Sequence, residues 1–165
     1  MQVIGVAGYS GVGKTTLVER LVDRLSDRGT VGTVKHLGHE PRIDTEGKDT
    51  ARHRAAGADV TYGIEGAGAW FATGADLTLQ DALDEMAPAY DYAVIEAFSD
   101  ARIPQVRLGD RDVAGDVVYE APDADAVDLD ALVETVETLD PYETLESLVA
   151  RIKRAEGTEQ SGAIA

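Results

Sequence analysis

The sequence predicts an α/β fold in which a mainly parallel β-sheet is flanked by helices. Two apolar runs, residues 3–7 and 92–95, have the length and the β-branched residues of buried strands. Leucines spaced by four residues from Leu17 to Leu25 indicate a helix directly after the first run. At 165 residues, 44% of them hydrophobic, the chain is large enough to form one domain around a core.

A glycine-rich loop joins that first strand to that first helix. Residues 8–15 read Gly-Tyr-Ser-Gly-Val-Gly-Lys-Thr, which is the pattern G-x-x-x-x-G-K-T. Glycines let such a loop curl so that its backbone N–H groups surround phosphate oxygens, and the helix N-terminus adds further amides. Lys14 is placed to reach the terminal phosphates, and the Thr15 hydroxyl is placed to ligate Mg²⁺. The residues expected to bind the nucleotide here are Ser10, Gly11, Val12, Gly13, Lys14, Thr15 and Thr16.

The composition limits the classes of partner. The net charge is −16, and it is divided unevenly: residues 1–57 carry +2 and residues 58–165 carry −18. A chain this acidic is not expected to bind nucleic acid, and its charge is typical of a solvated surface suited to a cytoplasm of high salt. There is no cysteine, no apparent signal peptide and no apolar run of membrane-spanning length. We expect a cytoplasmic protein with no membrane partner.

The second strand is expected at residues 30–35. It places Lys35 and His36 at its carboxyl end, where open α/β sheets bind their ligands, so we expect these two residues to contact phosphate or a partner. The spacing of His36 and His39, with His53 further on, also allows zinc, although no cysteine supports that alternative.

The middle of the chain combines a charged segment with two more strands. Residues 44–50 include carboxylates and a lysine. Such a composition is expected of a switch segment, which changes conformation in response to the terminal phosphate and its Mg²⁺. A short helix is expected at residues 50–57, followed by strands at 58–64 and 69–73, with Trp70 and Phe71 in the core.

The last part of the chain carries a second candidate for the metal site. A helix at residues 78–87 precedes the apolar strand that ends at Glu96, the position where a Mg²⁺-binding acid is expected downstream of such a loop. Shorter strands follow at 103–108 and 117–120, and the aspartates between 123 and 130 are expected to be acidic surface. A capped helix is predicted from Asp140, with Pro141 in its first turn. The domain is expected to span residues 1–156, with a disordered tail at 157–165.

With these residues in place, the chain resembles the molybdopterin-guanine dinucleotide biosynthesis protein B (MobB) family of P-loop NTPases. The shared landmarks are segments 8–16, 34–36, 44–58, 94–98 and 103–104, in the family's order and spacing. Segment 44–58 is the specific one, because a glycine loop alone occurs in many kinds of protein.

The resemblance implies a fold of the dethiobiotin-synthetase-like branch and a GTP-binding protein with weak Mg²⁺-dependent hydrolysis. It implies Lys14 and Glu96 as the catalytic residues and Lys35 as a residue that faces the phosphates. Thr15, Asp49 and Glu96 are implied as the Mg²⁺ groups. The implied role is to support the guanylyltransferase MobA in attaching GMP to molybdenum-molybdopterin. The implied partners are GTP, a MobA-type enzyme, molybdopterin and a second copy of the chain in a homodimer.

Two segments depart from the family's usual pattern. Glu96-Ala97-Phe98-Ser99 stands where the family usually has Glu-Gly-Phe-Lys, so a basic group is expected to be missing near the site. The run from Lys35 to His39 has one histidine fewer than the family's Lys-His-Thr-His-His. The chain contains no asparagine, and therefore no Asn-Lys-x-Asp guanine motif, which leaves Asp123 as a candidate to read the base.

Two other classes of function remain open at this point. One is a small-molecule phosphotransferase or ligase of the dethiobiotin-synthetase or nucleoside-kinase type. In it, an anionic acceptor would be held by Lys35, His36, Arg52 and Arg54. The other is an interaction module that no longer binds nucleotide, against which the intact loop argues.

Overall fold

The structure, a computed structural model, describes residues 1–39, 49–145 and 148–149 of the chain. Most of the switch expected at 44–50 and the tail expected at 157–165 lie outside the described residues. The chain divides into two compact units, one formed by Met1–His36 with Gln80–Ala165 and the other by Leu37–Leu79.

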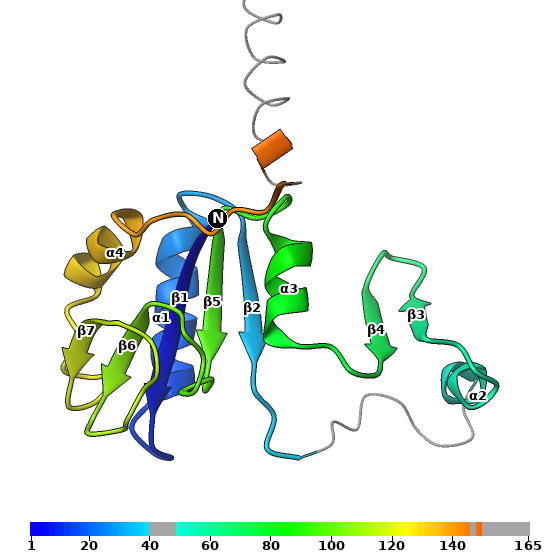
Figure 1. Cartoon of the computed structure of the whole chain (residues 1–165), viewed down its shortest axis with the longest axis horizontal. Helices are drawn as coiled ribbons and strands as arrows, with labels where there is room; N and C mark the ends of the chain where they lie inside the picture. Colours follow the sequence, from blue (N-terminus) through cyan, green and yellow to red (C-terminus); the bar gives the residue numbers. More distant parts are fainter. Residues whose placement is uncertain (40–48, 146–147, 150–165) are drawn as a thin grey trace, which may run out of the picture. The chain divides into compact units, whose positions relative to one another are not determined.

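The first unit contains a five-stranded sheet in which every pair of neighbouring strands is parallel. Its order is β2-β5-β1-β6-β7, and the arrows of these five strands point the same way in Figure 1. The strands are β1 (Gln2–Gly8), β2 (Val31–Lys35), β5 (Tyr92–Glu96), β6 (Gln105–Leu108) and β7 (Val117–Ala121). The predicted α/β fold with a mainly parallel sheet is therefore confirmed, and so are its five strands to within a few residues.

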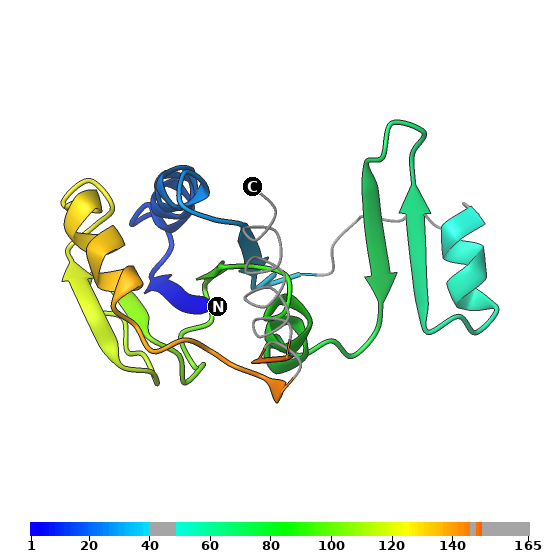
Figure 2. The ribbon, with the colours of Figure 1, turned by 90° about the horizontal axis from the view of Figure 1, so that it is seen from above.

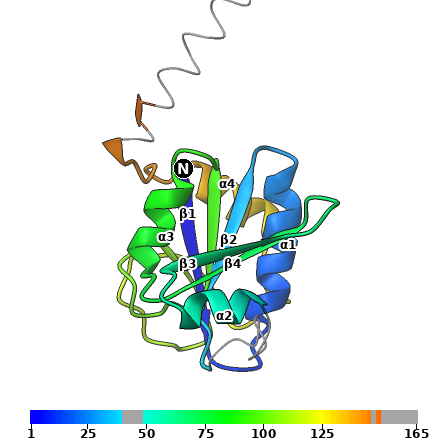
Figure 3. The ribbon, with the colours of Figure 1, turned by 90° about the vertical axis from the view of Figure 1, so that its right-hand side faces the viewer.

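Helices cover both faces of this sheet, with α1 and α3 on opposite sides in Figure 3. The unit's helices are α1 (Lys14–Ser26), α3 (Leu79–Met86) and α4 (Leu129–Glu137). The main core joins the leucine stripe of α1 to one face of the sheet and to α4, and Leu17, Leu21 and Leu25 are fully buried. Successive strand residues face opposite sides, so Val94 faces this core while Ile95 faces away from it.

Asp128 is exposed, as expected, and its Oδ1 also accepts hydrogen bonds from the backbone N–H groups of Asp130 and Ala131 and caps α4. One expectation for the C-terminal part was wrong. The helix predicted to start at Pro141 is absent over residues 141–144, and the first helical residue is Leu145. The backbone N–H of Tyr142 instead donates to the carbonyl of Met1, 2.8 Å away, which holds this stretch in a non-helical conformation.

The second unit consists of α2 (Asp49–Ala55) and a hairpin of β3 (Val60–Ile64) and β4 (Trp70–Gly74), with the strands antiparallel. Figure 2 shows α2 beside this hairpin. Trp70 was expected in the core, yet it is 65% exposed. It lies opposite Ile64, and directly opposed residues share a face of a hairpin, so both belong to the exposed face that also carries Tyr62.

None of the helices in the described part of the chain is long and apolar enough to cross a membrane.

Candidate functional site

The glycine loop lies between β1 and α1, at the carboxyl end of the sheet. Gly11 and Gly13 have φ angles of 89° and 84°, a left-handed conformation that favours glycine. A Cβ on Gly13 would also lie 2.6 Å from the Cβ of Ala124, so no side chain fits there. Gly13 is the N-cap of α1, and no side chain accepts a hydrogen bond from the helix's first turn. The loop is thus curled, and the helix terminus behind it is available to an anion.

Four predicted site residues meet beside this loop. Lys14 Nζ donates to the carbonyl of Tyr9, 2.7 Å away. Thr15 Oγ1 donates to Glu96 Oε1 at 2.8 Å. Lys35 Nζ lies 2.9 Å from Glu96 Oε1 and 3.4 Å from Thr15 Oγ1. Residues from a helix and two strands therefore form one polar cluster, which we call the Thr15–Lys35–Glu96 cluster.

The sheet topology explains why these residues meet. Strand β5 lies between β1 and β2, and Lys35 is the register partner of Glu96. Glu96 lies two residues after Val94, which faces the α1 side of the sheet, so its carboxylate points toward the first turn of α1. Glu96 is only 7% exposed, and burial of its charge is offset by hydrogen bonding to Thr15 and pairing with Lys35.

The cluster has donors that suit Mg²⁺. The ion prefers hard oxygen ligands, and proteins usually supply one or two of them while phosphate and water supply the rest. A hydroxyl and a carboxylate 2.8 Å apart next to a phosphate-binding loop match that requirement. Lys35 Nζ contacts both of these oxygens, so a positive charge is already stabilised at this point.

Asp49, the third predicted metal group, belongs to the second unit. It is the first residue of α2, its side chain is 91% exposed, and its Oδ1 lies 3.8 Å from Arg52 Nη1. Its role as a metal ligand stays a prediction. Among the described residues, no three histidine, cysteine or acidic side chains lie close enough together to hold a metal by themselves.

The other predicted loop residues occupy the positions expected from the motif. Ser10 and Thr16 are exposed, and Val12 is half-buried. The carbonyl of Val12 accepts a hydrogen bond from the backbone N–H of Ala124, which anchors the loop to the segment after β7.

The segment after β5 is held in an unusual backbone conformation. Ala97 has a φ of 71°, in the left-handed region, where the family usually has glycine. Its N–H donates to the carbonyl of Val6, and Gln105 Nε2 donates to the carbonyls of Phe98 and Ala101. The ring of His36 lies 5.1 Å from that of Phe98, so His36 packs against this segment.

A residue that the sequence analysis missed supplies a positive charge at the same place. Arg111 lies in the loop between β6 and β7, its Nη2 donates to Ser99 Oγ at 3.1 Å, and its guanidinium carbon is 5.1 Å from the centre of the Tyr9 ring. A basic group was expected to be missing near the site because Ser99 replaces the family's usual lysine. That expectation was wrong, and no sequence pattern around Arg111 indicated the contact.

The candidate base-reading acid has a local structural role. Asp123 Oδ1 accepts hydrogen bonds from the backbone N–H groups of Asp125 and Ala126, both at 3.0 Å. An open hollow of about 580 Å³ lies close by at the carboxyl ends of β6 and β7. It is lined by Gly109, Asp110, Glu120, Ala121 and Pro122.

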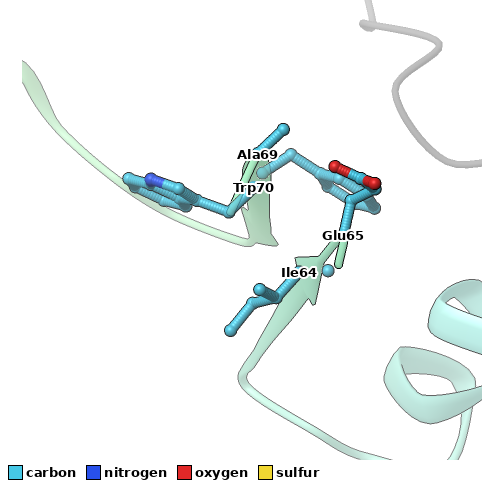
Figure 4. A pocket seen from close by; sticks show the side chains of 6 residues that line it. Ile64, Glu65, Ala69 and Trp70 are labelled. Carbon is cyan, nitrogen blue, oxygen red and sulfur yellow. The ribbon is translucent and has the colours of Figure 1, made fainter. Parts of the chain in front are cut away.

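The hairpin of the second unit carries another shallow hollow, of about 470 Å³, shown in Figure 4. Its lining is mostly apolar and includes Ile64, Trp70 and Phe71, with Glu65 as its acidic member. In Figure 4 the Ile64 and Trp70 side chains project from one side of the hairpin and the Glu65 carboxylate from the other.

Known proteins resemble the chain over most of its length. The family model described as Molybdopterin guanine dinucleotide synthesis protein B matches residues 3–135. A Haloferax volcanii protein described as a probable molybdopterin synthase is 39% identical over 160 residues, or 97% of this chain. A probable molybdopterin-guanine dinucleotide biosynthesis adapter protein of Bacillus subtilis is 51% identical over 69 residues, 40% of this chain. The matched regions span only 57% and 39% of those two relatives.

Solved structures give the same result for the fold. The crystal structure of Bacillus subtilis MobB has a TM-score of 0.61 and 30% identity, and the match covers 84% of this chain and all of that one. A MobB homologue from Bacillus stearothermophilus has a TM-score of 0.57 and 25% identity, again over 84% of this chain and all of that one. The strand order, the glycine loop and these matches agree, and the chain belongs to the MobB family of P-loop NTPases.

Proposed function

We propose that this protein is a GTP-binding adapter of molybdopterin guanine dinucleotide biosynthesis that hydrolyses GTP slowly with Mg²⁺. The observation that carries the proposal is the Thr15–Lys35–Glu96 cluster beside a curled glycine loop. It combines the groups that Mg²⁺-dependent triphosphate binding requires, namely a phosphate-binding loop, a lysine, a hydroxyl and a buried carboxylate.

Each residue has a distinct task in this proposal. The loop amides and Lys14 bind the phosphates, and Lys14 exchanges the Tyr9 carbonyl for phosphate oxygens. Thr15 and Glu96 would hold Mg²⁺, and the ion would neutralise charge on the transferred phosphoryl group. Asp49, in the second unit, stays a predicted further acidic group. Lys35 pairs with Glu96 in the structure and turns to the phosphates when nucleotide binds.

Slow turnover follows from how the nearest glutamine is used. P-loop GTPases accelerate hydrolysis with a glutamine that orients the attacking water. Gln105, the nearest glutamine after the Glu96 strand, is 1% exposed, and its amide donates to Phe98 and Ala101. It is therefore committed to the fold and is not available to orient a water, which supports the proposal of slow hydrolysis.

We propose that the hollow at the ends of β6 and β7 receives the base. Guanine presents N–H donors, for which carboxylates are suitable acceptors. Asp110 and Glu120 both line the hollow, but Glu120 is paired with Arg107 and Asp123 is used in its own turn, so Asp110 is the acceptor we propose.

The partner assignments rest on the family. Four of the curated relatives are described as molybdopterin-guanine dinucleotide biosynthesis adapter proteins, two of them as probable or putative, and adapters act through partners. We propose that this chain supports a MobA-type guanylyltransferase that handles molybdopterin. We also propose that it forms a homodimer through the exposed apolar face of the β3–β4 hairpin.

We propose that its acidic surface is adapted to high salt. With a net charge of −16, self-repulsion is strongest at low ionic strength. The melting temperature is expected to rise steadily as potassium chloride is added, and a melting temperature independent of salt would contradict this.

Calorimetric titration at high salt tests the nucleotide proposal. GTP, GDP and ATP are titrated with and without Mg²⁺, and GTP with Mg²⁺ is expected to bind tightest. Lys14→Ala is expected to abolish binding. Arg24→Ala is the matched control, because it removes one positive charge from α1 at a residue that pairs with Asp130 on α4. Unchanged GTP affinity in Lys14→Ala would refute the assignment of the site.

A further inference from the structure

The loop between β6 and β7 places an arginine against the phosphate-binding loop. Arg111 lies over the ring of Tyr9, the second residue of the glycine motif, with its guanidinium carbon 5.1 Å from the ring centre. The same Tyr9 accepts the hydrogen bond of Lys14 through its carbonyl. One loop residue thus contacts two cations, one through its ring and one through its backbone.

The backbone holds Arg111 in this position. The N–H of Ala114 donates to the carbonyl of Ser99, and the N–H of Gln105 donates to the carbonyl of Asp116, each at 2.8 Å. A Cβ on Gly115 would lie only 1.9 Å from the carbonyl oxygen of Ile103. The backbone at Gly115 therefore packs so closely against Ile103 that no side chain fits there. The loop that carries Arg111 is therefore fixed at its C-terminal end, over residues 114–116.

The guanidinium of Arg111 has hydrogen-bonding capacity left for a ligand. Its hydrogen bond within the described residues goes to Ser99 Oγ, a neutral acceptor, and uses one of several N–H donors. No carboxylate of the described residues forms an ion pair with it, although Asp110 and Asp112 flank it in sequence. A half-buried guanidinium without an anionic partner favours an anion from outside the chain.

Lys14 and Arg111 both contact Tyr9, and this indicates where a bound anion would lie. Lys14 Nζ, 2.7 Å from the Tyr9 carbonyl, marks the end of the loop where the terminal phosphates bind. Arg111 approaches that end over the ring of the same residue. We propose that Arg111 binds the terminal phosphoryl group of the nucleoside triphosphate and thereby makes the protein discriminate triphosphate from diphosphate. This inference rests on the proposed nucleotide-binding function.

The experiment measures the dissociation constants of GTP, a non-hydrolysable GTP analogue and GDP, all with Mg²⁺, for the wild type and for variants at this position. Arg111→Ala is expected to weaken binding of GTP and of the analogue about tenfold and to change GDP binding by less than about twofold. Arg111→Lys keeps the charge without the forked donors and is expected to lie between Arg111→Ala and the wild type. Arg107→Ala, which breaks the ion pair with Glu120 on the same side of the sheet, is the control and should leave the GTP-to-GDP ratio unchanged.

The outcomes separate this inference from the proposed function. If Arg111→Ala weakens GTP and GDP equally, the arginine acts only by packing on Tyr9, and the inference is overturned. If it changes neither, the inference is overturned as well, while binding by the wild type keeps the proposed function intact. Failure of the wild type to bind either nucleotide would overturn both.

Discussion

Lys35 and Glu96 face each other in register on the parallel strands β2 and β5, and Lys35 Nζ lies 2.9 Å from Glu96 Oε1. The ammonium group also lies 3.4 Å from Thr15 Oγ1. A cation of the chain therefore contacts both of the oxygens proposed as Mg²⁺ ligands.

This arrangement predicts how Glu96→Gln will behave. The substitution keeps the shape of the side chain but removes the charge that holds Lys35 and would hold Mg²⁺. We expect the affinity for GTP in excess Mg²⁺ to fall about tenfold, while the affinity measured in EDTA stays nearly constant. Calorimetric titration under both conditions measures the change. Glu134→Gln, at an exposed position of α4, is the control. Equal losses with and without Mg²⁺ would show that Glu96 does not act through the ion.

A second prediction concerns backbone strain at Ala97. The left-handed conformation costs a residue with a Cβ about 1–2 kcal/mol, part of which glycine would recover at the expense of a more flexible unfolded chain. We expect Ala97→Gly to raise the free energy of unfolding by about 0.5–1 kcal/mol in urea titrations. Ala101, four residues further along the chain, has no positive φ, so Ala101→Gly should lower the free energy of unfolding instead. A destabilised Ala97→Gly would mean that the backbone there carries no strain.

A third prediction concerns the apolar face of the β3–β4 hairpin. Val60, Tyr62, Ile64 and Trp70 are 49%, 57%, 77% and 65% exposed, which makes a contiguous apolar surface. We expect light scattering to give the mass of two chains for the wild type and of one chain for Trp70→Glu. Leu77→Glu is the control, because Leu77 is 71% exposed but lies outside the hairpin. A dimer that tolerates Trp70→Glu would exclude this face as the interface.

A fourth prediction concerns alkaline pH. Burial, together with a 2.5 Å hydrogen bond from its hydroxyl to Asp84, raises the pKa of Tyr142 to about 12 from the ordinary value of 10.0. Between these values the unfolded chain loses the phenolic proton while the folded protein keeps it. The stabilising contribution is complete below pH 10 and is lost as the pH rises toward 12. Melting temperatures measured across this range are therefore expected to fall.

Tyr142→Phe should reduce the slope of that fall, because it removes the titrating hydroxyl. Part of the slope should remain, since burial also raises the pKa of Tyr92. If Tyr142→Phe follows the wild-type curve, the phenol is not the group responsible.

Local patterns in the sequence were sufficient to predict the strand, the loop and the helix that carry the candidate site. The run before Gly8, the glycines after it and the leucines of α1 predicted a strand, a phosphate-binding loop and a helix, because each depends on residues close together in the chain. A local pattern was misleading at Pro141. Asp140 and Pro141 predicted the start of a helix, but the N–H of Tyr142 donates instead to the carbonyl of Met1, at the other end of the chain.

By itself, the sequence determined the parallel α/β fold, the phosphate-binding loop and the position of a carboxylate at a strand end, since backbone propensity and hydrophobic period are local properties. Only the tertiary structure decided which strands are neighbours, and it thereby brought Lys35 to Glu96 across β2 and β5. It also placed Arg111 on Tyr9 and left Trp70 exposed. The two contacts join residues far apart in the chain, and the exposure of Trp70 depends on which face of the hairpin is covered. Neither property is encoded in a local sequence pattern.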